Sequence, residues 1–203
     1  MKIINVDQNS PEWHQLRLGK ITASIMSKVV TRTGKPSASV DDVINRAVAE
    51  LILQEPDESY ISDAMLRGRD LEDQALKFFN FTNDYSFVKT GFLDSELGYG
   101  CSPDGIDLVN EVGLELKCPM PHTHISYLAD EQLPDQYWQQ VQGSLMVSGF
   151  KTWIFGSYHP RLPCFKVLVE RDEKYISILR EETEKACEKI KQKHLKLLVK
   201  ITG

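Results

Sequence analysis

The chain has 203 residues, a formal net charge of −5 at pH 7, and 41% hydrophobic and 26% charged residues. This length fits one domain, residues 1–203, that buries most of its apolar surface, and the composition is ordinary for a globular protein. The negative charge argues against a surface that coats nucleic acid nonspecifically, although phosphate affinity can come from a local basic track.

Targeting signals and cysteine spacing give a second set of limits. No apolar stretch is long enough to span a bilayer, and the first five residues lack a signal-peptide pattern. The four cysteines form neither a C-x-x-C pair nor a zinc spacing. We therefore expect a cytoplasmic protein with reduced thiols and no zinc site.

The first part of the chain predicts helices. Ser10 followed by Pro11 is a typical helix start, because serine caps free backbone N–H groups and proline fits the first turn. The apolar spacing gives four helices, at about 11–18, 22–30, 40–53 and 63–81, the last capped by Ser62 or Asp63, with a mobile Gly/Pro/Ser/Lys-rich loop at 31–39.

The second part alternates strands and helices. Strand-like runs occur at 87–92, 105–109 and 112–118, a helix at about 134–149, two more strands at 152–158 and 165–170, and a last helix from Asp172. No internal repeat or interdomain linker interrupts this order. The order predicts an α/β fold with a mixed central sheet flanked by helices on both faces.

Two of these strands flank the turn-forming pair Asn110 and Glu111 and predict a hairpin that carries charged residues. Side chains alternate along a strand, so Glu115 and Lys117 point to one face. Asp104 enters the other strand from a Pro-Asp-Gly turn, so two carboxylates and one ammonium would converge. Mg²⁺ usually takes one or two protein carboxylates and leaves sites for water and phosphate. The pattern resembles the active-site core of the PD-(D/E)XK nucleases, and the alternative is a polar hairpin with solvated charges.

A further carboxylate, Glu72, lies on the long helix at 63–81. Gly68 precedes it by one turn on the same face and leaves open space beside it. Taken with the hairpin, Glu72 becomes a candidate third carboxylate. By itself Glu72 is better explained as one charge on a solvent-facing helix whose glycine costs some stability.

The segment 13–24 places Arg17, Thr22 and Ser24 around a helix junction. Hydroxyls and free N–H groups at a helix start bind anions, and an arginine can hold a phosphate through two hydrogen bonds. The alternative is simple capping by Thr22 or Ser24, with Arg17 in a surface ion pair.

Together these blocks resemble the bacteriophage lambda exonuclease (YqaJ-type viral recombinase) family. The shared motifs are Trp-x-x-Leu-Arg-Leu-Gly-x-Ile-Thr-Ala-Ser, Gly-x-x-x-Glu, Cys-Ser-Pro-Asp-Gly, Gly-Leu-Glu-Leu-Lys-Cys-Pro and Gln-Gln-Val-Gln, at 13–24, 68–72, 101–105, 113–119 and 139–142. The segment 170–175 also looks like that family's strand-to-helix junction. The match covers about residues 13–175 in the family's order.

The resemblance implies a Mg²⁺-dependent exonuclease that digests one strand of duplex DNA from its 5′ end and leaves a 3′ single-stranded overhang. It also implies a homotrimeric ring threaded by DNA, a single-strand annealing partner, and action in the cytosol of a bacterial host. Whether Mn²⁺ can replace Mg²⁺ is not decided by the sequence.

The resemblance also assigns roles to residues of this chain. The chemistry of phosphodiester hydrolysis adds that two Mg²⁺ ions would sit among the acids. Asp104 lies between the other two acids in sequence and would bridge the ions, and Glu115 and the Leu116 carbonyl would hold the nucleophile-side ion. By the resemblance, the metal-binding acids would be Glu72, Asp104 and Glu115, and the catalytic lysine would be Lys117. Gln140 would help to set the attacking water. The contacts to the terminal phosphate and nearby backbone would come from Arg17, Thr22, Ser24 and Ser102.

One stretch departs from the family. Between Pro119 and Tyr137 the match fades, and the family's further phosphate-binding arginine is replaced by His122, Thr123 and His124, which we interpret as loop residues near DNA. The rival functions are a PD-(D/E)XK endonuclease or repair-type nuclease, and a catalytically silent module that binds DNA ends. The chain has no phosphate-binding loop motif and so no ATP motor.

Overall fold

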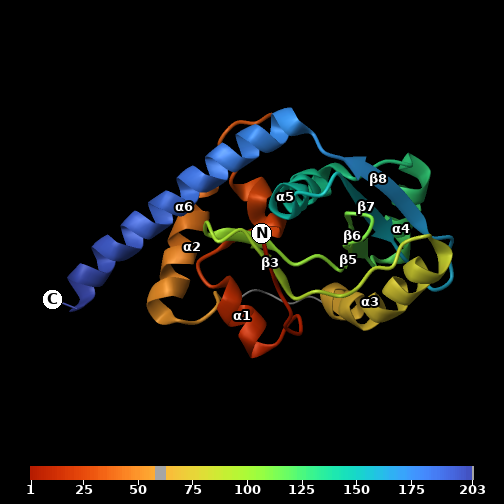
Figure 1. Cartoon of the computed structure of the whole chain (residues 1–203), viewed down its shortest axis with the longest axis horizontal. Helices are drawn as coiled ribbons and strands as arrows, with labels where there is room; N and C mark the ends of the chain where they lie inside the picture. The colour runs from red at the N-terminus through yellow and green to blue at the C-terminus, as the bar shows by residue number, and fades with distance from the viewer. Residues whose placement is uncertain (58–62, 203) are drawn as a thin grey trace.

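The computed structural model describes residues 1–57 and 63–202 (Figure 1). The helices are α1 (Pro11–Arg17), α2 (Val40–Leu53), α3 (Asp63–Thr82), α4 (Pro121–Asp130), α5 (Trp138–Ser148) and α6 (Glu173–Thr202), with 3-10 helices η1 (Ala23–Lys28) and η2 (Asp135–Tyr137). The strands are β1 (Lys2–Ile4), β2 (Ile21–Thr22), β3 (Phe92–Asp94), β4 (Tyr99–Cys101), β5 (Gly105–Asp107), β6 (Val112–Lys117), β7 (Thr152–Ser157) and β8 (Phe165–Glu170). The predicted cap at Ser62 lies outside the described residues.

The eight strands in the described part of the chain divide between two mixed four-stranded sheets, in the orders β1-β3-β4-β2 and β5-β6-β7-β8. In the second sheet β6 pairs with β5 antiparallel and with β7 parallel, so β6 is central. The fold is of the mixed α/β class, as predicted. The strands form two sheets, whereas one central sheet was expected. The strand expected at 87–92 is mostly irregular, because only Val88 bridges to Ile106 before β3 begins at Phe92.

Helix α5 joins the two sheets. It packs against η1, against β3 and β4 of the first sheet, and against β6 and β7 of the second (Figure 1). Its apolar residues after Trp138 are buried, with Val141 and Leu145 fully enclosed. Helix α6 crosses α5 and runs along α2, and α3 covers β6 from another side. Because α5 contacts strands of both sheets, it holds the two sheets next to each other.

Local sequence signals explain the ends of several helices. The Ser10 hydroxyl accepts the Trp13 N–H at 3.2 Å, as expected of an N-cap. Gly149, at φ 75°, ends α5 in the left-handed region that favours glycine. The helix expected at 22–30 is wrong in type, because the chain forms the short strand β2 and then the 3-10 helix η1. Thr22 caps nothing through its side chain and instead hydrogen-bonds the Ser24 hydroxyl at 3.0 Å.

The segment after β6 corrects another expectation. His122 and His124 lie in helix α4 and not in a loop. His124 is fully buried, and its ring nitrogens lie 2.7 Å from the Ser157 hydroxyl and 2.8 Å from the Pro163 carbonyl. These contacts tie α4 to β7 and to the segment before β8, so His124 is a packing residue and does not face a ligand. Within 1–57 and 63–202, no helix is both long and apolar enough to cross a membrane.

Candidate active site

Strand β6 brings Glu115 and Lys117 to one face, as the strand period predicts. The Lys117 ammonium lies 2.5 Å from Glu115 Oε1. The Gln140 amide, from α5, donates to the same oxygen at 2.6 Å. Glu115 is only 3% exposed. A buried carboxylate is costly unless it is paired and hydrogen-bonded, and these two donors meet that requirement.

Asp104 lies just before β5, where it contacts the neighbouring strand β6. Its backbone N–H donates to the Leu114 carbonyl at 3.1 Å, and its carboxylate accepts the Leu116 N–H at 2.5 Å. In an extended strand the N–H and C=O of one residue project to the same edge. The Leu116 carbonyl therefore lies at the edge that faces Asp104, which places a third oxygen donor beside the two carboxylates.

The electrostatics of this group are strongly coupled. Burial, followed by the nearby charge of Glu115, raises the pKa of Asp104 well above its usual value, and the charge of Glu72 adds to the rise. Burial alone would lower the pKa of Lys117, but Glu115 and Asp104 raise it overall. Lys117 therefore keeps its proton in the metal-free protein at neutral pH, while the Asp104 carboxyl resists ionisation because the nearby ammonium offsets the rise in its pKa only in part.

This coupling predicts a stability effect. A carboxyl whose pKa is raised on folding destabilises the fold as pH rises above its unfolded pKa of about 4. Asp104→Asn should therefore raise Tm in EDTA at pH 8, and the gain should shrink as pH falls. Differential scanning calorimetry at several pH values measures this. A variant that melts below the wild type at pH 8 contradicts the assignment.

The predicted residues share one cavity of about 180 Å³ at the junction of the two sheets. Eight of the ten expected site residues line it: Arg17, Thr22, Ser24, Ser102, Asp104, Glu115, Lys117 and Gln140. Leu116 and Glu72 are not among the residues that line it. Gln8 and Trp13 also line the cavity, and neither was expected there.

Trp13 holds Arg17 in place. The Arg17 guanidinium carbon lies 3.8 Å from the centre of the Trp13 ring, an arrangement typical of a cation–π contact. The indole N–H lies 3.0 Å from both the Ser102 hydroxyl and the Gly91 carbonyl, and Arg17 reaches Ser102 at 3.5 Å. Burial lowers the pKa of Arg17 to about 10, so it stays charged at neutral pH. The four-residue spacing of Trp13 and Arg17 on α1 was the available signal.

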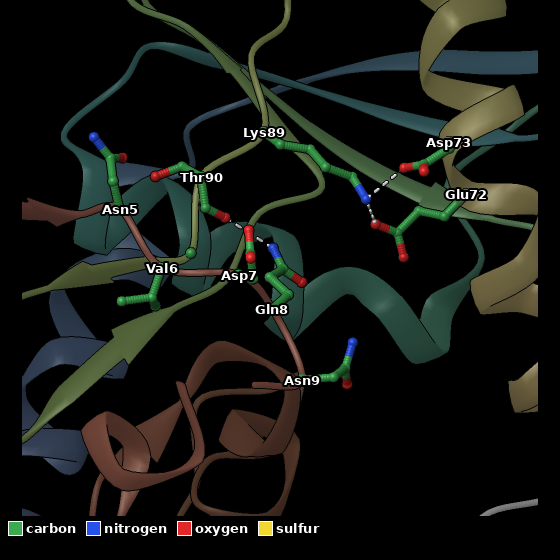
Figure 2. A pocket seen from close by; sticks show the side chains of 10 residues that line it. Asn5, Val6, Asp7, Gln8, Asn9, Glu72, Asp73, Lys89 and Thr90 are labelled. Carbon is green, nitrogen blue, oxygen red and sulfur yellow. Dashed lines mark hydrogen bonds and ion pairs between the residues drawn. The ribbon is translucent and has the colours of Figure 1, made fainter. Parts of the chain in front are cut away.

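Glu72 faces a neighbouring cavity of about 500 Å³ (Figure 2). It forms an ion pair with Lys89 at 3.0 Å, and Lys89 also pairs with Asp73 at 2.7 Å. Gln8 lines both cavities. The structure therefore brings Glu72 beside the other acids without placing it among them. A Cβ added at Gly68 would meet no atom of the described residues within 4 Å, which agrees with the open space predicted there.

An arginine from α3 reaches the end of β6. Arg67 donates to the carbonyls of Cys118 at 3.2 Å and of Pro119 at 2.8 Å. No arginine occurs between Pro119 and Tyr137. Arg67 was not expected here. The family resemblance places a phosphate-binding arginine in the segment that follows the Glu-x-Lys strand, whereas Arg67 belongs to helix α3, earlier in the chain.

The donor set fits a divalent cation that keeps part of its water. In the described part of the chain, no three His, Cys, Asp or Glu side chains form a ready-made cage. Two carboxylates and one carbonyl nevertheless match the way Mg²⁺ is bound in phosphate-processing sites, where water and substrate complete the shell. Asp104, Glu115 and the Leu116 carbonyl are the residues that would hold it.

The fold and this site define the class: a nuclease of the PD-(D/E)XK type. Residues 12–151 match the model of the YqaJ-like viral recombinase domain, and the chain belongs to that family. An alkaline exonuclease (LHK-Exo) from Laribacter hongkongensis is similar in structure, with 27% identity, a TM-score of 0.84, and coverage of 95% of this chain and 98% of that one. The same figures hold for LHK-Exo in complex with dAMP.

A phage-related exonuclease from Haemophilus somnus 129PT shares the fold at 15% identity, with a TM-score of 0.69 and coverage of 88% of this chain and 96% of that one. No curated protein matches this chain. The family resemblance expected from the motifs is confirmed, and the chain is an enzyme of the nuclease class.

Proposed function

We propose that this chain is a divalent-metal-dependent exonuclease that digests the 5′-ended strand of duplex DNA and leaves a 3′ overhang for recombination. The observation that carries the proposal is one cavity that holds both an Asp–Glu–Lys group and an arginine with hydroxyls. The first group suits phosphodiester hydrolysis and the second suits a terminal phosphate. The exonuclease activity in the name of the similar Laribacter protein supports the same function.

Each residue of the Asp–Glu–Lys group has a separate task. A divalent ion, when bound by Asp104 and Glu115, would activate water and stabilise the attacking and leaving oxygens. Lys117 lies against Glu115, where its amine would orient the water, help to deprotonate it and offset charge on the phosphate. Gln140 steers the same water from α5 while it also holds Glu115.

Arg17 gives the site its polarity. A terminal phosphate carries more negative charge than an internal diester, so the half-buried Arg17 guanidinium would distinguish the two. Ser102, Thr22 and Ser24 line the same cavity and supply hydroxyl donors. A 5′-phosphate held there would place the first phosphodiester near Lys117, so the enzyme would remove nucleotides from the 5′ end.

Arg17→Ala tests this polarity. Charge-assisted hydrogen bonds contribute about 1.5–3 kcal/mol each, and 1.4 kcal/mol is about a factor of ten. We expect at least a roughly tenfold loss of initial rate on 5′-phosphorylated duplex and a much smaller loss on the matched 5′-hydroxyl duplex. Equal slowing of both substrates would make Arg17 a general backbone or structural contact.

Processivity would come from topology, because the chain has no phosphate-binding loop motif to drive a motor. We propose a homotrimeric ring around the duplex, two Mg²⁺ ions per site, and transfer of the exposed strand to an annealing protein in the bacterial cytosol. Light scattering of the purified chain measures the first of these directly, and a monomer at working concentration would contradict it.

A further inference from the structure

Lys89 lies between two carboxylates of helix α3. Figure 2 shows its ammonium directed at both, 3.0 Å from Glu72 and 2.7 Å from Asp73. The two acids differ in setting: the Glu72 side chain is 22% exposed, whereas that of Asp73 is 73% exposed. Lys89 thus has one partner turned towards the protein and another turned towards solvent.

Glu72 is also the acid of this pair that the geometry places beside the catalytic group, because Gln8 lines both the Glu72 cavity and the cavity of Asp104 and Glu115. The two regions are joined by Gln8, whose amide donates at 2.9 Å to both the Thr90 and the Pro103 carbonyls. The segment that carries Lys89 is therefore held against the segment that carries Asp104.

We propose that Lys89 competes with a divalent cation for Glu72, and that Asp73 is the partner to which Lys89 retreats when the cation binds. An ammonium and a divalent ion at one carboxylate repel each other, so only one can hold it closely. The exchange requires little rearrangement, because Lys89 already contacts Asp73 and keeps that contact after release. This inference rests on the proposed metal dependence and makes Lys89 a positioning residue that sets metal affinity.

Two neighbouring substitutions should have opposite effects. Lys89→Met frees Glu72 and should tighten Mg²⁺ binding. Asp73→Asn removes the second partner of Lys89, so that Lys89 pairs with Glu72 alone. This variant should weaken Mg²⁺ binding. Each change should be about two- to fivefold, the size expected from a partly exposed ion pair.

Calorimetric titration of Mg²⁺ into the metal-free full-length chain tests this. Lys151→Met is the control, because Lys151 is exposed and, among the described contacts, has no ion pair with Glu72 or Asp73. It should leave the Kd nearly unchanged. In a Glu72→Gln background, Lys89→Met should lose its effect.

The inference is overturned if Lys89→Met binds Mg²⁺ no more tightly than wild type, if Asp73→Asn tightens binding, or if the Lys89 effect persists without Glu72. Cleavage of duplex DNA is measured separately. If the variants show the expected changes in Mg²⁺ affinity but the wild type cuts no DNA, the proposed function is wrong. The competition between Lys89 and the cation for Glu72 would still stand. Unchanged melting curves in EDTA confirm that each variant folds.

Discussion

Lys117→Ala should lower metal-dependent cleavage of duplex DNA at least about a hundredfold, which is the loss typical of removing one preorganised donor to a transition state. The ammonium lies against Glu115 and over the Tyr137 ring at 5.3 Å, so the protein fixes its direction before substrate arrives. Binding of DNA ends should stay nearly intact, because Arg17 and the hydroxyls are untouched. Single-turnover digestion and end-binding titrations measure the two quantities.

Folding must be separated from chemistry in this variant. Removing Lys117 leaves Glu115 buried, although Gln140 still donates to it. Lys117→Gln, which keeps a donor but no charge, is the companion variant and should be similarly inactive. Lys151→Ala, at an exposed position, is the control and should retain full activity. Turnover like the wild type in Lys117→Ala under saturating Mg²⁺ would remove the residue from the mechanism.

Asp104→Ala and Glu115→Ala should each abolish Mg²⁺-dependent cleavage and weaken Mg²⁺ binding by at least about tenfold, equivalent to about 1.4 kcal/mol. The reason is that both carboxylates and the Leu116 carbonyl meet at one edge of β6. Metal binding stabilises a fold by about 2.7 kcal/mol at a hundred times the Kd. The rise in Tm that Mg²⁺ gives the wild type should therefore vanish in both variants.

The two acids should also differ from each other. If Asp104 bridges two ions, its loss removes both, whereas the loss of Glu115 should affect chiefly the nucleophile-side ion. Calorimetry reports the number of ions and their Kd. Asp70→Ala, at an exposed position on α3, is the control. Two ions bound to Asp104→Ala at unchanged affinity would rule out the bridging role.

The elements that could be predicted from the sequence are those long enough to show a regular spacing of apolar and polar residues. Strand β6 is six residues long, and its alternation alone predicts that Glu115 and Lys117 share one face. Strands β1 and β4 are three residues long and too short to show a period. Helix α4 was missed although its buried residues His124 and Tyr127 are spaced as on one helical face.

Nonlocal contacts account for the rest. The division of the strands into two sheets depends on pairing between distant segments, such as β1 with β3, which sequence patterning does not encode. Lys89 at Glu72 and Arg67 at the end of β6 likewise join segments far apart in the chain. Trp13 under Arg17 is local and its helical spacing was visible, but an apolar residue in a helix gives no sign of contacts with Arg17 and Ser102.

The most direct test of the proposed exonuclease compares linear duplex DNA with a covalently closed circle of the same sequence, each incubated with the enzyme in Mg²⁺ and in EDTA. With a 5′-end label on the linear substrate, we expect early release of labelled mononucleotide in Mg²⁺, no release in EDTA, and an intact circle in both. Cutting of the closed circle would contradict the exonuclease assignment in favour of an endonuclease, and release of label in EDTA would contradict the role of the metal.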